Sequence, residues 1–453
     1  MGLSAKLFFD TTDAETLSSR ISLTSEQLDE ARVKKNKLLE LIKPELSSSL
    51  ELPVKHWLQG SYKNHTLIRP IQKGDEFDID VGIYILCHAE DEGLSAFEVK
   101  NLNRQVLEWY ASNRSEAQLE NSKTSCERLS YPSSFHTDIP IYYYDQQDDI
   151  CKLATQNNEW IDSDPKALQD WFNYKTSSLS TKSLSQLRRI IKYLKVWTAI
   201  KGKDDNISIP SIALTVLVAL NYVETEDDDD SFIETSVKVM GYISENSTLD
   251  NPVQIGDLFG FDEDDYQSIK KKSVALKNSC EFIKDSTDSF QQYVLWSATF
   301  EHMFPPFVER ADEVVKNTNL PAITISPKIR VRHNDKGKKL LANKVADEIR
   351  VFRDEELYFS IDNKQDYSET AEVHWIVRNQ DAEAMRLNDL GHTTVLSVND
   401  ERYEGCSYRG THYMECLILD QNNIKGIGAV KVRITGFSRP VRNPPRKKHY
   451  KGR

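Results

Sequence analysis

Residues 77–87 read FDIDVGIYILC, a run of apolar residues interrupted by two acids. A short apolar run rich in β-branched and aromatic residues predicts a buried strand. Side chains at positions i and i+2 of a strand share a face about 6.6 Å apart. Asp78 and Asp80 therefore point the same way, and their apolar neighbours point into the core. We expect a central strand that presents two carboxylates on one face.

Two carboxylates on one face repel each other, and a divalent cation relieves this repulsion. Mg²⁺ prefers one or two carboxylates, several waters and the phosphates of a substrate. Residues 135–144, FHTDIPIYYY, predict a neighbouring strand in which Asp138 alternates with Thr137 and Ile139. A third carboxylate there completes a two-metal site, with ions about 3.5–4 Å apart. The sequence thus predicts two Mg²⁺ ions, with Mn²⁺ as a substitute, on Asp78, Asp80 and Asp138.

Residues 59–62 read QGSY and precede the acidic strand. A glycine lets the backbone approach a phosphate closely. If a short helix opens at Ser61, its free N–H groups and the serine hydroxyl can hold a triphosphate. Taken singly, a Gly-Ser pair is most often a turn, and an Asp-x-Asp pair is most often two solvated residues. The combination of Gly60, Ser61 and the three acids, in this order around an apolar strand, is far more specific.

The first two thirds of the chain divide into a mixed part and a helical part. A capping box at Thr24 predicts a long amphipathic helix to about Pro44, and residues 95–112 predict another. We expect an α+β catalytic core at 1–165 and a helical lobe at 166–308 that closes the cleft. Within the lobe, an apolar helix at 212–223 should be followed by a solvated acidic loop at 224–230.

In the last third of the chain, the spacing of apolar residues changes from the helical period of 3.6 to the strand period of 2. Residues 309–354 are charged and irregular, which suggests a connector with one helix near 337–352. Alternating apolar residues then predict a small β-rich domain at 355–438. Residues 439–453 are basic and interrupted by proline, and should be disordered.

Composition limits the partners. The 453 residues carry a net charge of −12, which argues against wrapping of nucleic acid and against a double-stranded DNA activator. No apolar run reaches the roughly 18 residues that span a bilayer, and the N-terminus is a poor signal peptide. We therefore expect a cytoplasmic protein with no membrane partner. Six scattered cysteines without a C-x-x-C pair give no sign of a disulfide framework or zinc site.

The motifs together resemble a known family. QGSYKNHTLIRP, EFDIDVGIYI and HTDIPIY are similar to the DNA polymerase β-like nucleotidyltransferases. Within these they resemble the bacterial cGAS/DncV-like branch (CD-NTases) of CBASS anti-phage systems. The resemblance implies a mixed sheet with flanking helices plus a helical lobe. The gap between Ser61 and Asp78 exceeds the shortest family spacing, so the intervening loop should be enlarged. Segments of the C-terminal part resemble the AGS-C sensor-like domain: ELYFSI, AEVHWIVRNQDAEAMR and YRGTHYMECLIL.

The resemblance also implies further nucleotide-binding residues. The segment 193–197 resembles a family Y-L-K-x-W segment whose lysine reaches the triphosphate, a role that falls on Lys195 and, one turn earlier, on Lys192. Ser211 resembles a nucleotide-contacting serine at the start of the next helix, and Gln59 accompanies the Gly-Ser pair. For the two lysines, a solvated basic helix face is the alternative.

The implied reaction is template-independent nucleotidyl transfer. Asp138 would hold the metal that lowers the pKa of the acceptor ribose hydroxyl, which attacks the α-phosphate of a nucleoside triphosphate. Repetition and ring closure would give a cyclic oligonucleotide second messenger, with ATP as the favoured substrate, a downstream effector as its target and CBASS regulatory proteins as further partners. A linear 2′–5′ oligoadenylate or poly(A)-type synthase is one alternative, separated by phosphatase resistance of the product. A non-catalytic nucleotide sensor is another, separated by a product assay.

Overall fold

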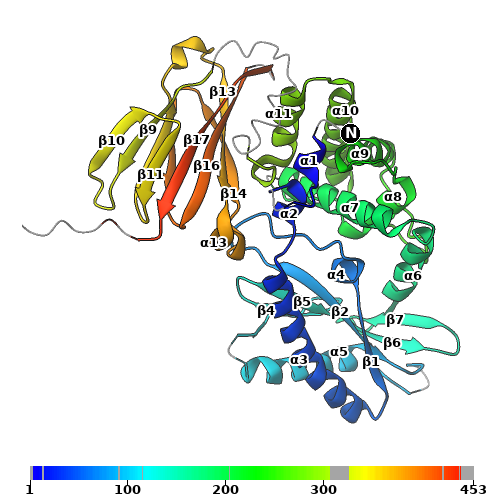
Figure 1. Ribbon diagram of the computed structural model, residues 1–453. Coiled ribbons are helices and arrows are strands. Elements are labelled where there is room, and N and C mark those ends of the chain that lie inside the picture. Colours follow the sequence, from blue (N-terminus) through cyan, green and yellow to red (C-terminus); the bar gives the residue numbers. More distant parts are fainter. Residues whose placement is uncertain are drawn as a thin grey trace, which may run out of the picture. The chain divides into compact units, whose positions relative to one another are not determined.

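The chain forms two compact units in the computed structural model, which describes residues 4–12, 15–89, 92–114, 116–203, 205–306, 326–420, 423–437 and 439. The first unit contains Met1–Pro305, and most of the second lies in Leu320–Met385 and Leu390–Arg453 (Figure 1). Among the described helices, none has an 18-residue stretch apolar enough to span a membrane.

A mixed eight-stranded sheet forms the centre of the first unit, as the sequence predicts. Its middle strand is β2 (Phe77–Ile85), which pairs in parallel with β5 (Phe135–Ile139) and β6 (Ile141–Asp145) and antiparallel with β1 (Val54–Leu58). The order is β3-β4-β5-β2-β6-β7-β8, with β3 at Gln118–Leu119, β4 at Glu127–Tyr131, β7 at Ile150–Ala154 and β8 at Trp160–Asp162. The expected single strand over 135–144 is therefore two strands that both pair with β2.

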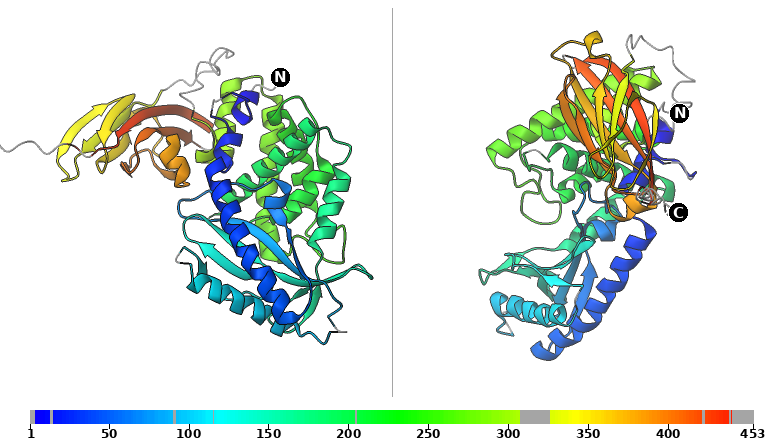
Figure 2. Two further views of the ribbon diagram at one scale, coloured as in Figure 1. Left: turned by 60° about the horizontal axis from the view of Figure 1, so that its bottom comes forward. Right: turned by 90° about the vertical axis from the view of Figure 1, so that its left-hand side faces the viewer.

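Helices α3 (Ser25–Leu50) and α5 (Ala96–Ser112) pack against this sheet (Figures 1 and 2). The predicted α5 is confirmed almost to the residue, and the capping box at Thr24 opens α3 as expected. The expected end near Pro44 is wrong, because α3 continues through the proline to Leu50. Proline removes one backbone hydrogen bond, whereas Ile42 and Leu46 on either side are fully buried in the core. Their burial holds the part of α3 that follows the proline in place.

The helical lobe follows the sheet and belongs to the same unit (Figure 2). It contains α6 (Pro165–Lys175), α7 (Thr181–Lys201), α8 (Ser211–Asn221), α9 (Asp228–Glu245), α10 (Glu263–Asp285) and α11 (Ser289–Phe300). The apolar helix predicted at 212–223 is α8, whose central residues are buried. The chain's start joins the lobe as well: α1 (Ala5–Phe8) inserts Phe8 among aromatic rings, including those of Tyr193 and Trp296.

The solvated loop expected at 224–230 is only partly right. Asp228, Asp229 and Asp230 form the first turn of α9, and the first two are only 3% and 2% exposed. Asp228 accepts both guanidinium hydrogen bonds of Arg189, at 2.6 and 2.8 Å, and one from the Tyr193 hydroxyl at 2.8 Å. Acids at a helix N-terminus are favoured by the helix dipole. Three adjacent acids thus begin a helix here because partners elsewhere in the lobe neutralise the first of them.

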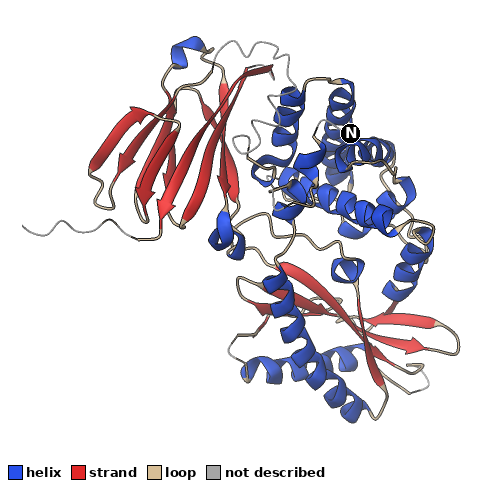
Figure 3. Cartoon of the chain, viewed as in Figure 1, coloured by secondary structure: helices blue, strands red, loops and turns tan. Residues whose placement is uncertain are grey.

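The second unit is a sandwich of two sheets (Figure 3). One has the order β10-β9-β12-β15 and the other β11-β17-β16-β13-β14. The strands are β9 Ile329–Asn334, β10 Leu340–Val345, β11 Glu348–Phe352, β12 Glu356–Ile361, β13 Glu372–Asn379, β14 Gly391–Ser397, β15 Arg402–Gly405, β16 Gly410–Asp420 and β17 Asn423–Thr435, with a short helix α13 at Asp381–Arg386. The alternation around Trp375, Cys416 and Val432 marks β13, β16 and β17, and all three side chains face the shared core.

The expected connector at 309–354 with a helix near 337–352 needs correction. That helix is absent: β10 and β11 occupy the segment, and β9 precedes them, so the β-rich fold begins at Ile329 rather than at 355. The charged residues there lie on exposed strand faces, which hides the alternation. Of the tail expected to be disordered, only Arg439 lies within the described residues.

Candidate active site

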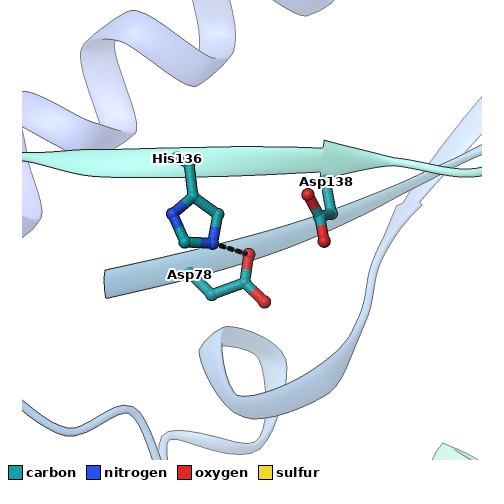
Figure 4. A group of neighbouring side chains, drawn as sticks. All are labelled: Asp78, His136 and Asp138. Carbon is teal, nitrogen blue, oxygen red and sulfur yellow. Dashed lines mark ion pairs between the residues drawn. The ribbon is translucent and has the colours of Figure 1, made fainter. Parts of the chain in front are cut away.

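The register of two parallel strands assembles the acidic cluster. In the β2–β5 pair, Asp78 lies beside His136 and Asp80 lies beside Asp138. The predicted alternation holds on both strands, because Phe77, Ile79, Thr137 and their equivalents are buried in the opposite direction. Figure 4 shows the three side chains of Asp78, His136 and Asp138 turned toward one another from adjacent strands. The structure thus brings the predicted acids together on neighbouring strands, on one face of the sheet.

His136 is a member of this cluster that sequence reasoning missed. Its Nε2 lies 3.2 Å from Oδ1 of Asp78, and its Nδ1 lies 3.5 Å from Glu76. One ligand atom each from Asp78, His136 and Asp138 lie within 4.8 Å of one another, which is a spacing that can hold a metal ion. The signal was present in the sequence, because positions 136 and 138 share a strand face.

Asp80 is the carboxylate most strongly perturbed by the site. Burial, together with the nearby charges of Asp78 and Asp138, raises its pKa to about 7. Gly60 presses directly on this side chain: a Cβ at Gly60 would lie 2.1 Å from Oδ2 of Asp80, and the backbone φ of +59° is in the left-handed region. Only glycine suits this position, both for space and for backbone conformation.

Asp138 is held by two cations rather than left free. Arg128, its direct cross-strand neighbour on β4, donates from Nε to Oδ1 at 2.6 Å and from its terminal nitrogen to Oδ2 at 2.7 Å. Lys123 lies 3.6 Å from the same carboxylate. Burial alone would raise the pKa of Asp138, but these neighbours lower it below its ordinary value. The bidentate pair fixes the orientation of the carboxylate. Sequence reasoning missed Arg128, since only the β4–β5 register reveals it.

A cavity of about 430 Å³ opens beside the acids. Its lining includes Gly60, Ser61, Asp78, Asp80, Lys195 and Ser211. Ser61 lies in the short helix α4 (Gly60–Asn64), and Ser211 is the first residue of α8. Most of the residues expected to contact nucleotide therefore meet around one space, although they come from three helices and a strand.

The two lysines predicted on α7 separate in the structure. Lys195 is 7% exposed, donates to the carbonyl oxygen of Thr66 at 3.1 Å and lines the cavity. Burial lowers its pKa to about 8, against the opposing effect of Asp80. Lys192, one turn earlier, is half-buried and lies outside that lining. Arg188 and Arg189 surround it, and burial together with these charges lowers its pKa.

A second cavity of about 270 Å³ adjoins the first, and the two share Gly60, Asn64, Asp80, Ile212 and Thr215. Its apolar wall comes from α6, with Leu168, Trp171 and Phe172. Gln59 also lines it, but its amide is occupied: Nε2 donates to the Tyr84 hydroxyl at 2.5 Å, and Oε1 accepts from the Tyr142 hydroxyl at 3.5 Å. These bonds point to a positioning role for Gln59.

The acidic cluster fits divalent cations. Three carboxylates lie on adjacent strands, and burial together with the other two acids raises the pKa of Asp80 to about 7. Oxygen-rich sites of this kind suit hard cations, which bind ionised carboxylates. A cation there would favour the charged form of Asp80. The chemistry of the donor set therefore agrees with a metal site.

The chain matches two family models. Residues 54–142 match the nucleotidyltransferase domain of the DncV-like cyclic GMP-AMP synthases. Residues 296–435 match the Adenylyl/Guanylyl and SMODS C-terminal sensor domain. The first covers the strand-bound acids together with the Gly-Ser pair, and the second covers the β sandwich.

Individual relatives extend these matches. A cyclic GMP-AMP synthase of Escherichia albertii is 34% identical over 449 residues, which is 99% of this chain and 98% of that protein. A c-di-GMP synthase of Roseivirga ehrenbergii is 29% identical over 134 residues, covering 28% of this chain and 33% of that protein. Among solved structures, the Vibrio cholerae cyclic AMP-GMP synthase DncV with a linear intermediate has a TM-score of 0.52 at 18% identity, covering 64% of this chain and 94% of that one.

The fold and site define a nucleotidyltransferase with a DncV-like core, a mixed sheet with flanking helices. The near-full-length relative shows the family directly. This chain belongs to the DncV-like nucleotidyltransferases, the cyclic dinucleotide synthases, and carries their C-terminal sensor domain.

Proposed function

We propose that this protein joins ATP and GTP into a cyclic GMP–AMP dinucleotide, using two Mg²⁺ ions. The observation that carries the proposal is the 34% identity to a cyclic GMP-AMP synthase along almost the whole chain. The geometry supports it, since Asp78 and Asp80 face a cavity that Ser61, Lys195 and Ser211 also line. Two adjoining cavities that share Asp80 offer room for two nucleotides on either side of the reacting atoms.

In this proposal the residues divide the work by position. Gly60 lets the backbone and the Asp80 carboxylate come together at the phosphate, and Ser61 and Lys195 bind the donor triphosphate. Ser211 contributes a hydroxyl from the start of α8. Divalent cations held by Asp78, Asp80 and Asp138 would neutralise the phosphates and lower the pKa of the acceptor hydroxyl. Arg128 keeps Asp138 oriented toward its neighbours throughout.

His136 and Lys192 take supporting roles. His136 contacts Asp78 and orients that carboxylate. Lys192 lies outside the cavity lining, so it adds positive charge near the triphosphate without contacting it. Neither residue needs to touch the reacting atoms.

The test is to incubate the purified protein with all four nucleoside triphosphates and Mg²⁺ or Mn²⁺, then identify the products by mass spectrometry. We expect a product with the mass of a cyclic dinucleotide of one adenosine and one guanosine monophosphate that resists phosphatase. A phosphatase-sensitive chain would instead identify a linear 2′–5′ or poly(A)-type synthase. Absence of any product from wild-type protein, with nucleotide binding intact, would favour a nucleotide sensor.

The biological setting follows from the proposed product. A cyclic dinucleotide acts as a second messenger, so we propose an anti-phage CBASS role with a downstream effector as its receiver. Nucleoside triphosphates and Mg²⁺ are supplied by the cytoplasm, where we place the enzyme. Infection of cells that carry the enzyme and its effector, compared with an Asp78→Ala, Asp80→Ala variant, tests this setting by phage yield.

A further inference from the structure

Asn64 lies where the two cavities of the active site meet. It is the last residue of α4, four positions after Gly60, and therefore on the same helix face. Five residues line both cavities. Among these five, the side chains of Asn64 and Asp80 are polar and make no hydrogen bond to any other residue that the structure describes. Thr215, by contrast, donates its hydroxyl to the backbone of Ser211 at 2.8 Å.

The side chain of Asn64 is buried without being satisfied. The residue is only 7% exposed, and its carbonyl oxygen Oδ1 has no hydrogen-bond partner within the described part of the chain. A buried acceptor that loses its bonds to water costs free energy unless a partner replaces them. The neighbouring Gln59 shows the contrast, since both ends of its amide are bonded to tyrosine hydroxyls. A partner for Asn64 is therefore expected from the contents of the cleft.

The position of Asn64 limits which group can donate a hydrogen bond to its Oδ1. Phosphate oxygens only accept hydrogen bonds, so they cannot satisfy a carbonyl oxygen. The donors on a nucleoside triphosphate are the ribose hydroxyls and the N–H groups of the base. The flat apolar wall of Trp171 and Phe172 in the second cavity suits a base. Asn64 lines the second cavity together with this wall, and it lines the first cavity together with Asp80.

We propose that the Asn64 carbonyl oxygen accepts a hydrogen bond from an O–H or N–H group of one bound nucleotide, which makes Asn64 a specificity-determining residue. The inference rests on the proposed function in one respect, namely that the cleft binds nucleoside triphosphates. It goes further in assigning discrimination to one side chain. A site built around a buried acceptor rejects an analogue that lacks the matching donor.

The experiment measures binding rather than turnover, by calorimetry on the full-length protein with Mg²⁺ and α,β-methylene triphosphates. Adenosine and guanosine nucleotides are compared with analogues that each lack one donor: 2′-deoxyribose, 3′-deoxyribose, purine riboside without the 6-amino group, and inosine without the 2-amino group. We expect one analogue to bind the wild type about fivefold more weakly than its parent. The ribose and base analogues separate the two sources of the donor.

Asn64→Ala and Asn64→Leu should bind that one analogue as tightly as its parent nucleotide. The ratios of analogue affinity to parent affinity should stay unchanged for the other analogues. Asn101→Ala, an exposed asparagine on α5, is the matched control and should keep every ratio. Because the two Asn64 variants delete an unsatisfied buried acceptor, their melting temperatures should equal or exceed that of the wild type. A purely structural Asn64 would give lower melting temperatures with all ratios retained, and that result overturns the proposal.

The outcome is separable from the proposed product. A wild type that discriminates through Asn64 but makes no cyclic dinucleotide would keep this inference and refute the product. A wild type that makes the dinucleotide, with both Asn64 variants showing unaltered ratios, would refute this inference alone. Wild-type protein that binds every analogue as tightly as its parent also refutes it. Failure to bind any nucleotide would contradict both proposals.

Discussion

At the scale of single residues, the ionised form of Asp80 is unfavourable in the folded protein, and a bound divalent cation would stabilise it. Its pKa of about 7 reflects burial near Asp78 and Asp138. Enzymes place perturbed groups of this kind where charge will change during the reaction. Gly60 contributes to the same effect, because its missing side chain lets the backbone cover the carboxylate.

The raised pKa of Asp80 should make the stability of the protein depend on pH. Because the folded-state pKa of Asp80 exceeds its ordinary value, the folded protein binds a proton more tightly than the unfolded chain. Without divalent metal, stability from this group is present at acidic pH and is lost as pH rises toward and through 7. We expect Asp80→Asn to flatten the fall in melting temperature between pH 5 and 8 and to reduce synthesis roughly thousandfold or more.

Asp148→Asn, at an exposed position in the turn between β6 and β7 and outside the lining of both cavities, is the control and should change neither property. Differential scanning fluorimetry across the pH range gives the stability, and product formation gives the activity. An Asp80→Asn protein with the same pH profile as wild type would show that the Asp80 proton is not the source of the dependence.

Lys195 provides a second residue-scale test. A charge-assisted contact to phosphate contributes about 1.5–3 kcal/mol, so Lys195→Ala should raise the KM for ATP by about 10- to 100-fold. Lys182→Ala, an exposed lysine on the same helix, should leave KM unchanged. If both variants retain the wild-type KM, Lys195 serves only to anchor α7 to the carbonyl of Thr66.

At the scale of elements, the start of α9 is tied to α7 by one acidic side chain. Asp228 is buried against Arg189 and Tyr193, and the Tyr193 hydroxyl also lies 3.1 Å from the carbonyl oxygen of Phe8. One carboxylate therefore links two helices of the lobe to the N-terminal segment. The same lobe positions Lys195 and Ser211, so its rigidity bears on the cleft.

Asp228→Ala should destabilise this arrangement. Removing one partner of a fully buried ion pair costs about 3–5 kcal/mol, and we expect about 2–3 kcal/mol because the Arg189 side chain is 16% exposed. Urea unfolding followed by circular dichroism measures the loss. Glu226→Ala, an exposed acid in the same run, should cost less than about 0.5 kcal/mol. If the two substitutions lower the free energy of unfolding equally, residues 224–230 behave as the solvated loop that the sequence predicts.

At the scale of the whole molecule, each unit has its own core. The apolar cluster around β2, α3 and α5 belongs to the first unit, and the cluster around Trp375 belongs to the second. All the residues assigned to catalysis and nucleotide binding lie before residue 306. The division predicts that residues 1–305, which make up most of the first unit, fold and work by themselves.

A protein that ends at Pro305 should be soluble and should retain basal synthesis, within about tenfold of the full chain. The measurement compares nucleotide consumption and cyclic product for residues 1–305 and 1–453 at equal concentration, with circular dichroism as the check on folding. A folded 1–305 protein without detectable product would mean that the β sandwich belongs to the catalytic unit.

Local patterns in the sequence were sufficient for much of the site. Alternation along 77–87 predicts that Asp78 and Asp80 share a face, because a strand has a period of two whatever surrounds it. The same reasoning places Asp138 on the neighbouring strand. The apolar periods of α5, α8 and β13 likewise predict their elements, since burial of one face sets each pattern.

Only the tertiary structure identifies the residues whose roles depend on register, packing and closure of the lobe. Arg128 reaches Asp138 through the β4–β5 register, and His136 reaches Asp78 through the β2–β5 register. Asn64 lines both cavities, which α6 and α8 help to enclose. Two sequence predictions failed for the same reason: the helix expected at 337–352 and the expected end of α3 near Pro44. Burial against distant residues outweighed local charge and a proline, and one sequence without its fold carries no record of those distant partners.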